Sequence, residues 1–324
     1  MKKKEKLCLV LEGGGVKCSY QAGVLSVLNE FRYEYDAIGG TSFGALNAAL
    51  YLGGGMDRVN EFWDNLDAKA IFGDENVNLL MDDFYFKRDI VNSRNAKLVL
   101  GNLTDTKFYS KLSDMFHDFV INSVDEEKVR KSNKDFGLVT LAIPKLSKKL
   151  LDATMLLFNP VEAFFKIVQT NESDNKLIAG LDLKPLELVN EDIPSGHLAE
   201  FVAASSAISA FKPILIEDTY YTDGGPYDNQ PVNMMARRGY DKYLLIRTNT
   251  YDITGHYSNN LDVKVITPSR ELGSCALFSS YNVKDLRELG MSDAIKFLDQ
   301  ENGNLFSYLI KRQEVIKKYN IKNV

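Results

Sequence analysis

The sequence is poor in cysteine, proline and long apolar runs. Its three cysteines, Cys8, Cys18 and Cys275, lie far apart and form no Cys-x-x-Cys pair. We therefore expect neither a disulfide framework nor a structural zinc site. No apolar run approaches the length of a membrane span. What remains is an ordinary globular composition, with 45% hydrophobic and 26% charged residues in a chain of 324.

The charges are mixed and unevenly distributed. The net charge is -5, although residues 1–6 carry +3 and residues 311–324 carry +4. The body of the chain is therefore acidic, and nucleic acid is not an expected partner. We expect the basic ends to be solvated, with peripheral contact to an anionic membrane as the alternative. The start resembles a signal peptide, but Glu12 ends its apolar run after five residues, so we expect a soluble cytoplasmic protein.

Two successive strand–turn–helix units open the chain. The apolar run Leu7–Leu11 precedes three glycines and has the pattern of a strand buried on both faces. Apolar residues at helical spacing follow over Val16–Glu30. A second short apolar segment, Tyr35–Gly39, leads into a second helical stretch, Phe43–Leu52. This order predicts an α/β fold with parallel strands.

Further strands are expected at Phe136–Ile143 and at Tyr243–Arg247, the second after a helix-like stretch, Val232–Arg238. Residues 56–133 are polar and aromatic without a strong strand pattern, and we expect them to form a helical cover over one side of the sheet.

Residues 145–182 have the composition of an insertion. Within them Asn159-Pro160 precedes a helix whose apolar residues share one face. We expect this helix to pack against the body, with a lid or a membrane-facing helix as the alternative. The expected organisation is a single domain over residues 1–324, with a helical extension at 283–324.

Gly40-Thr41-Ser42-Phe43-Gly44 fits the G-x-S-x-G pattern between an expected strand and an expected helix. A nucleophile elbow needs this setting, because the sharp turn strains the serine backbone and leaves its Oγ exposed. The flanking glycines relieve crowding at the turn.

The run Gly13-Gly14-Gly15 closes the first expected strand and opens the first helix. Its N–H groups can bind an anion, either a nucleotide phosphate or the oxyanion of an ester under attack by a serine. The acid that a dinucleotide site needs at the end of the second strand is missing.

Ser42 needs a base, and two residue types are open. The chain has three histidines, His117, His197 and His256, and we expect all three in surface loops. His256 would complete a Ser-Asp-His order. The other candidate is Asp223, in an Asp-Gly-Gly turn.

Taken together, the motifs resemble patatin-like phospholipases in order and spacing. The residues that carry the resemblance are Gly13 to Lys17, Gly40 to Ala48, Asp223 to Gly225, Asn229 and Pro231, Ala203 to Ile208, Phe211 to Pro213, and Gly290 to Ala294. It covers roughly Lys6 to Leu298, excluding residues 145–182. Two positions depart from the family pattern, Cys18 in place of Gly and Ser209 in place of Pro. A positive φ at position 18 would make Cys18 distort the loop, whereas a position in the first helical turn would tolerate it.

The resemblance implies a three-layer α/β/α sandwich with a mainly parallel sheet. It implies a dyad of Ser42 and Asp223, with the amides of Gly13, Gly14 and Gly15 as oxyanion hole. The expected activity is hydrolysis of acyl esters in phospholipids or other acyl lipids, without metal or organic cofactor. The alternatives are a Ser-His-Asp esterase using His256, or a catalytically idle lipid- or nucleotide-binding protein.

The identity of the base carries an expectation for pH dependence. A free Asp has a pKa of about 3.9 and a free His one of about 6.5. An enzyme that relies on Asp223 is therefore expected to keep its base ionised below the pH at which a histidine enzyme loses it.

Overall fold

The computed structural model describes residues 6–67, 69, 71, 106–144, 183–207, 211–250, 257–258, 260–273, 275, 280–303, 305–322 and 324. The expected insertion at 145–182, Ser209 and His256 lie outside these residues. The strands are β1 (Leu7–Leu11), β2 (Ala37–Thr41), β3 (Asp135–Ile143), β4 (Lys184–Val189), β5 (Ile214–Ile216), β6 (Thr219–Asp223), β7 (Lys242–Ile246) and β8 (Asp262–Ile266). The helices are η1 (Gly15–Cys18, 3-10), α1 (Ser19–Glu30), α2 (Phe43–Asn65), α6 (Thr106–Ser123), α7 (Glu126–Lys131), α11 (Leu198–Ser205), α12 (Val232–Arg237), α13 (Ser280–Asn302) and α14 (Phe306–Tyr319).

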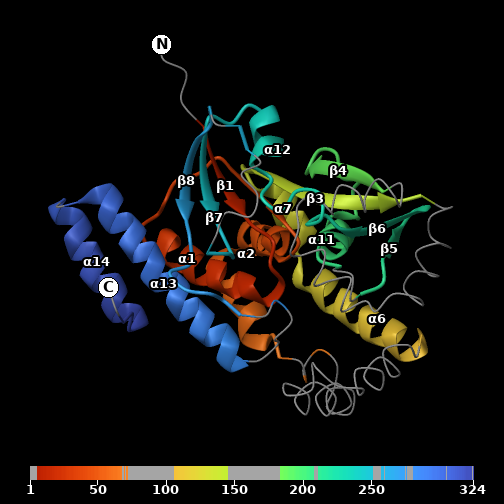
Figure 1. Cartoon of the computed structure of the whole chain (residues 1–324), viewed down its shortest axis with the longest axis horizontal. Coiled ribbons are helices and arrows are strands. Elements are labelled where there is room, and N and C mark those ends of the chain that lie inside the picture. The colour runs from red at the N-terminus through yellow and green to blue at the C-terminus, as the bar shows by residue number, and fades with distance from the viewer. Residues whose placement is uncertain are drawn as a thin grey trace.

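The described strands form one mixed sheet at the centre of the molecule (Figure 1). Its order is β5-β6-β3-β2-β1-β7-β8, with β4 on the other edge of β3. Strands β3, β2, β1, β7 and β8 are parallel, whereas β4 and β6 run antiparallel to β3, and β5 antiparallel to β6. The prediction of an α/β fold with a mainly parallel sheet is confirmed.

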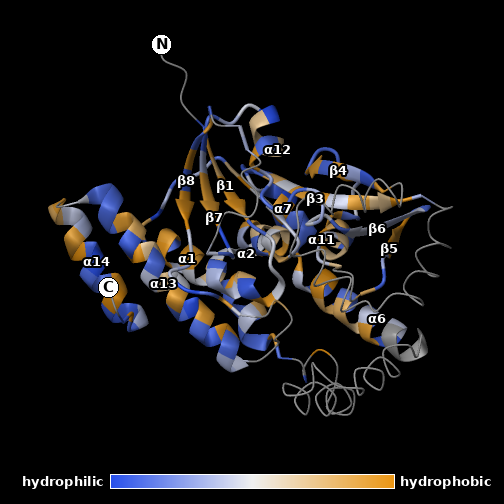
Figure 2. Cartoon of the chain, in the orientation of Figure 1, coloured by the Kyte–Doolittle hydropathy of each residue, from blue (hydrophilic) through white to orange (hydrophobic). Residues whose placement is uncertain are grey.

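Alternating side chains of the central strands point into two separate apolar layers. On β1, Leu9 and Leu11 join a large cluster with helices α1, α2, α6, α11 and α13. Cys8 and Val10 face the other way, into a smaller cluster with α12. This two-residue period places helices on both faces of the sheet and explains the continuous apolar run of β1. Figure 2 shows the apolar strands between helices of mixed polarity.

The apolar runs predicted the positions of β1, β2, β3 and β7 to within two residues at each end. Helix α1 begins later than expected, at Ser19, because a 3-10 turn over Gly15–Cys18 precedes it. Helix α2 continues beyond Leu52 to Asn65, across a break at Gly55, whose φ is +64°. Strands β4, β5, β6 and β8 were not predicted.

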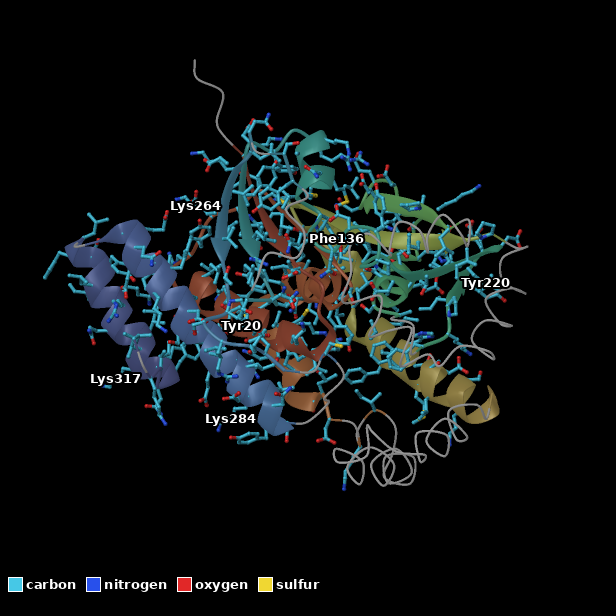
Figure 3. The ribbon with its side chains drawn as sticks, viewed as in Figure 1. Tyr20, Phe136, Tyr220, Lys264, Lys284 and Lys317 are labelled. Atoms are coloured by element: carbon cyan, nitrogen blue, oxygen red, sulfur yellow. The ribbon has the colours of Figure 1, made fainter. Side chains whose placement is uncertain are left out.

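Helix α13 packs along α1, and α14 lies outside it. The hydroxyl of buried Tyr20 on α1 donates to Asp293 of α13 at 3.3 Å. Lys284 of α13 and Lys317 of α14 lie on exposed faces (Figure 3). Among the helices of the described residues, none combines the length and the apolar character that crossing a bilayer requires.

Candidate active site

Strand β3 brings two distant chain segments together along one edge. Parallel β2 pairs with it up to Thr41 opposite Val139. Antiparallel β6 begins pairing at Asp223 opposite Thr140. Because β4 occupies the other edge of β3 over the same stretch, β2 and β6 meet end to end. The residue after β2, Ser42, therefore lies beside the last residue of β6.

The turn after β2 has the backbone geometry of a nucleophile elbow. Ser42 has a φ of 57° and a ψ of -134°, a strained conformation for a residue with a side chain. A Cβ at Gly40 would lie 2.5 Å from the carbonyl carbon of Gly44, so only glycine allows the strand and helix to approach this closely. The Ser42 N–H donates to Ser205 Oγ at 2.9 Å, and Ser205 Oγ donates to the Val139 carbonyl at 2.7 Å. The strain is thus held by contacts on β3 and α11.

Ser42 and Asp223 form a direct hydrogen bond. Ser42 Oγ donates to Asp223 Oδ2 at 2.7 Å, and the N–H of Gly225 donates to Asp223 Oδ1 at 2.7 Å. Both residues are buried, with 3% and 6% of their surface exposed. Burial raises the pKa of Asp223 to about 7, although the bonds from Gly225 and Ser42 oppose the shift. The expectation that this aspartate stays ionised well below the histidine range is therefore wrong for the free protein.

The glycine loop lies against the elbow. A Cβ at Gly13 would lie 3.1 Å from Ser42 Cβ. The Gly13 N–H donates to the Asn229 carbonyl at 3.2 Å. Within the described residues, the N–H groups of Gly14 and Gly15 have no acceptor. Gly15 has a φ of +56°, and a Cβ there would lie 2.4 Å from the carbonyl oxygen of Cys275, which explains the glycine.

Glu12 lies beside the glycine loop, although the sequence did not predict it as a site residue. Its carboxylate is 1% exposed and accepts three hydrogen bonds. The donors are the Thr248 N–H at 2.5 Å, Gln230 Nε2 at 3.0 Å and Asn249 Nδ2 at 3.0 Å. The signal in the sequence is an acid that directly follows an apolar strand and precedes the glycines. Its partners could not be found this way, because they come from the segments after β6 and β7, which only the folded chain brings to the end of β1.

Cys18 is accommodated without backbone strain. Its φ of -67° is helical, and its buried thiol donates to the Glu12 carbonyl at 3.5 Å. Position 18 thus lies in the first helical turns, where a cysteine is tolerated. Burial raises the pKa of the Cys18 thiol well above its ordinary value.

The two histidines within the described residues have partners away from the dyad. His117 lies on α6, is 6% exposed and makes edge-to-face ring contacts with Phe116 and Phe211, so the expectation of a surface loop is wrong for it. Burial lowers its pKa to about 4. His197 directly precedes α11 and pairs with Glu200, which raises its pKa.

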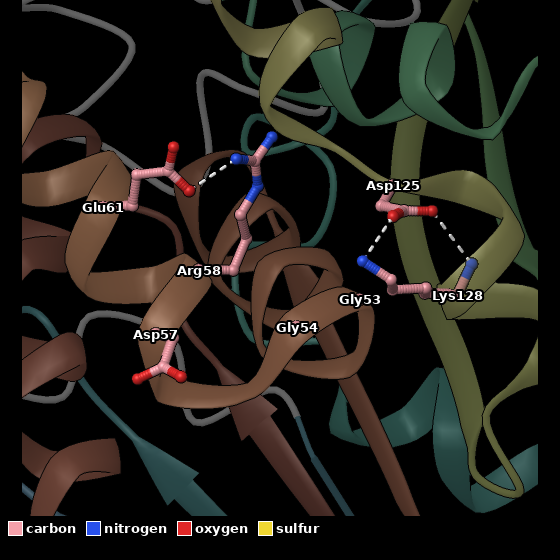
Figure 4. A pocket seen from close by; sticks show the side chains of 7 residues that line it. All are labelled: Gly53, Gly54, Asp57, Arg58, Glu61, Asp125 and Lys128. Atoms are coloured by element: carbon pink, nitrogen blue, oxygen red, sulfur yellow. Dashed lines mark hydrogen bonds and ion pairs between the residues drawn. The ribbon is translucent and has the colours of Figure 1, made fainter.

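A separate polar hollow lies between α2 and α7 (Figure 4). Arg58 pairs with Glu61, and Lys128 pairs with Asp125. Arg58 also donates to the carbonyls of Ser123 and Asn122 at the end of α6. The Arg58 bonds to these carbonyls tie α2 to α6, whereas the two ion pairs are local to one helix each, and none of the lining residues belongs to the Ser42 site. Across the described residues, no group of three or more His, Cys, Asp or Glu side chains gathers to hold a metal.

One comparison with known proteins, the scan of family models, agrees with the motifs. A family model described as patatin-like phospholipase matches residues 9–236, more than half of the chain. The solved structure of VipD from Legionella pneumophila aligns at 13% identity and a TM-score of 0.45, over 92% of this chain and 67% of VipD. The type III effector protein ExoU aligns at 14% identity and a TM-score of 0.35, over 92% of this chain and 53% of ExoU. A search of curated proteins finds no match.

Proposed function

Since this chain belongs to the patatin-like phospholipase family, we propose that it hydrolyses acyl esters of lipids with Ser42 as nucleophile and Asp223 as base. The observation that carries the proposal is the 2.7 Å hydrogen bond between Ser42 Oγ and Asp223 Oδ2 at a strained elbow. A serine alone is a weak nucleophile, and an adjacent general base activates it. Within the described residues Asp223 is the titratable group in contact with the Ser42 hydroxyl.

The reaction proceeds in two halves. In the first, Asp223 accepts the Ser42 proton while Oγ attacks the acyl carbonyl carbon, and the tetrahedral oxyanion collapses as the ester C–O bond breaks. The departing alkoxide takes the proton from Asp223, which leaves an acyl-Ser42 intermediate. In the second half Asp223 deprotonates water, which attacks the acyl carbon. A fatty acid leaves, and Ser42 regains its proton from Asp223.

The oxyanion is held by backbone amides of the glycine loop. We assign this role first to Gly14 and Gly15, because their N–H groups have no acceptor within the described residues. The Gly13 N–H already donates to Asn229, and it joins the hole only by sharing that bond. Amides fixed in this way supply the charge stabilisation that a cation would otherwise give.

The substrate class is a phospholipid or another acyl lipid, as for the family. The proposal includes no nucleic acid partner and no cofactor. We further propose that the protein is cytoplasmic and contacts membranes peripherally. This contact would bring the dyad to a lipid ester. Residues 145–182, outside the described part of the chain, are proposed to be an insertion that helps to shape the acyl site.

The proposal is tested by fatty-acid release from phosphatidylcholine vesicles and by hydrolysis of soluble p-nitrophenyl butyrate, each with and without EDTA. The wild type is expected to hydrolyse at least one ester in both conditions. Ser42→Ala is expected to lose more than about 10³-fold in kcat while keeping the wild-type circular dichroism spectrum. Full activity in Ser42→Ala would remove the nucleophile from the proposal, and loss of activity in EDTA would remove the metal-free mechanism.

A further inference from the structure

From the bonds around the Gly13–Gly14 peptide, we infer that Thr248, held by Glu12, is a positioning residue that aims the Gly14 N–H at the oxyanion. The inference rests on the proposed function, because it assigns a role within the same site. Thr248 follows β7, far from the glycine loop in sequence, and is 1% exposed.

The Gly13 carbonyl accepts two hydrogen bonds. Thr248 Oγ1 donates to it at 2.8 Å and Asn229 Nδ2 at 3.1 Å. A trans peptide is planar, and its C=O and N–H point in opposite directions. Fixing the Gly13 carbonyl therefore fixes the direction of the Gly14 N–H. A flip of this peptide would turn a carbonyl oxygen toward the developing negative charge and would remove one donor.

The Thr248 side chain has little freedom to move away. A Cβ at Gly14 would lie 2.6 Å from Thr248 Oγ1, so threonine and glycine are in direct contact. The Thr248 N–H donates to Glu12 Oε2 at 2.5 Å, and Glu12 lies one residue before the glycine loop. The parallel register of β1 and β7, with Leu11 opposite Ile246, brings these residues together.

The Glu12 carboxylate is in turn held from both sides of the loop. Gln230 Nε2 reaches it from the segment after Asp223, and Asn249 Nδ2 reaches it from the segment after β7. Lys17 Nζ donates to Asn249 Oδ1 at 2.8 Å, so a cation bonds to one of the donors of Glu12. The buried carboxylate thus orders Thr248 before any substrate binds, which is the preorganisation that an oxyanion hole requires.

The test is steady-state hydrolysis of p-nitrophenyl butyrate by the wild type, Thr248→Val and Thr248→Ser. Valine keeps the shape and the backbone N–H but lacks the hydroxyl donor, whereas serine keeps the donor. We expect Thr248→Val to lower kcat by about 10-fold to 100-fold with KM within about 2-fold, since one oxyanion donor accounts for roughly 10²–10³. Thr248→Ser is expected to stay within about 3-fold of the wild type.

Wild-type kcat in Thr248→Val, or an equal loss in Thr248→Val and Thr248→Ser, would overturn the inference. If Thr248→Val does not fold, Glu12→Gln serves as the second variant, and unchanged kcat in folded Glu12→Gln would overturn it as well. Ser42→Ala separates this failure from failure of the proposed function. An active wild type with inactive Ser42→Ala and fully active Thr248→Val removes only the inference, whereas equal hydrolysis by wild type and Ser42→Ala removes the proposed function.

Discussion

Two buried carboxylates, Glu12 beside the glycine loop and Asp223 beside the elbow, accept hydrogen bonds from different kinds of donor. Glu12 accepts three N–H bonds, all from groups that take no part in the proposed chemistry. Asp223 accepts two, and one of its donors is the Ser42 hydroxyl itself. Both side chains are almost fully buried. The difference lies in the donors: those of Glu12 fix the surrounding chain segments, whereas one donor of Asp223 is the hydroxyl whose proton Asp223 is proposed to take.

The segment after β6 connects the two regions. Gly225 donates to Asp223, Asn229 contacts both polar groups of Gly13, and Gln230 donates to Glu12. One short stretch of chain, residues 223–230, therefore carries the proposed base and also bonds to the glycine loop of the proposed oxyanion hole. These bonds fix the positions of Asp223 and of the glycine loop relative to Ser42.

The largest expected effect is on activity, which should depend on Asp223 much more than on Glu12. Asp223→Asn preserves the size of the side chain but removes the proton acceptor, so kcat should fall by about 10³-fold to 10⁴-fold on a soluble ester. Glu12→Gln should fall by much less, because the carboxylate touches no reacting atom. Equal losses in the two variants, measured under the same conditions, would contradict this separation of roles.

The second expected effect is on stability, which should depend on Glu12 more than on Asp223. In Glu12→Gln one oxygen replaces two, and the new NH₂ group faces an N–H donor. We expect the free energy of unfolding to fall by about 2–3 kcal/mol, the range for lost charge-assisted hydrogen bonds. Urea unfolding of both variants measures it, and Asp223→Asn is the matched control. A greater loss in Asp223→Asn than in Glu12→Gln at pH 8 would contradict the comparison.

The third effect is the pH dependence of stability from Asp223. Its folded pKa of about 7 lies above the ordinary value of 3.8. Between these values the folded state binds a proton that the unfolded state has lost, so this contribution to stability declines as the pH rises from about 4 to above 7. Asp223→Asn should lack this contribution. The change in Tm between pH 5 and pH 8 should therefore be more positive, or less negative, in Asp223→Asn than in the wild type; identical changes would contradict it.

The smallest expected effect concerns Cys18. Its backbone is helical, so glycine is not required there. Cys18→Gly should destabilise the fold by about 1–2 kcal/mol, through added chain freedom and the loss of a buried side chain. It should change kcat by less than about 10-fold. An increase of 10²-fold or more would show that the native loop is defective and would favour a catalytically idle protein.

Local sequence patterns were enough to predict the first two strand–turn–helix units. The apolar run of β1 and the glycines around Ser42 are short-range features, and each directly reports burial or a tight turn. Strands β4, β5, β6 and β8 were missed because they are short or polar, and pairing with neighbouring strands provides much of their context. The sequence put Asp223 forward as a candidate base for Ser42 beside the histidines, and the family resemblance favoured it over them.

Long-range pairing decides the parts that local patterns could not reveal. Nothing near Thr248 marks it as a neighbour of Gly13, because the parallel register of β1 and β7 brings them together. Burial likewise decides the properties of ionisable groups. The pKa of Asp223 rises and that of His117 falls because each group is enclosed by segments distant in sequence.

The most direct test of Asp223 as the base is kcat/KM against pH on a soluble ester, for the wild type and His256→Ala. The account predicts that kcat/KM falls about tenfold per pH unit below a pKa of about 7, because only ionised Asp223 accepts the Ser42 proton. It predicts the same acid limb in His256→Ala. Disappearance of that limb in His256→Ala would contradict the assignment and make the histidine the base.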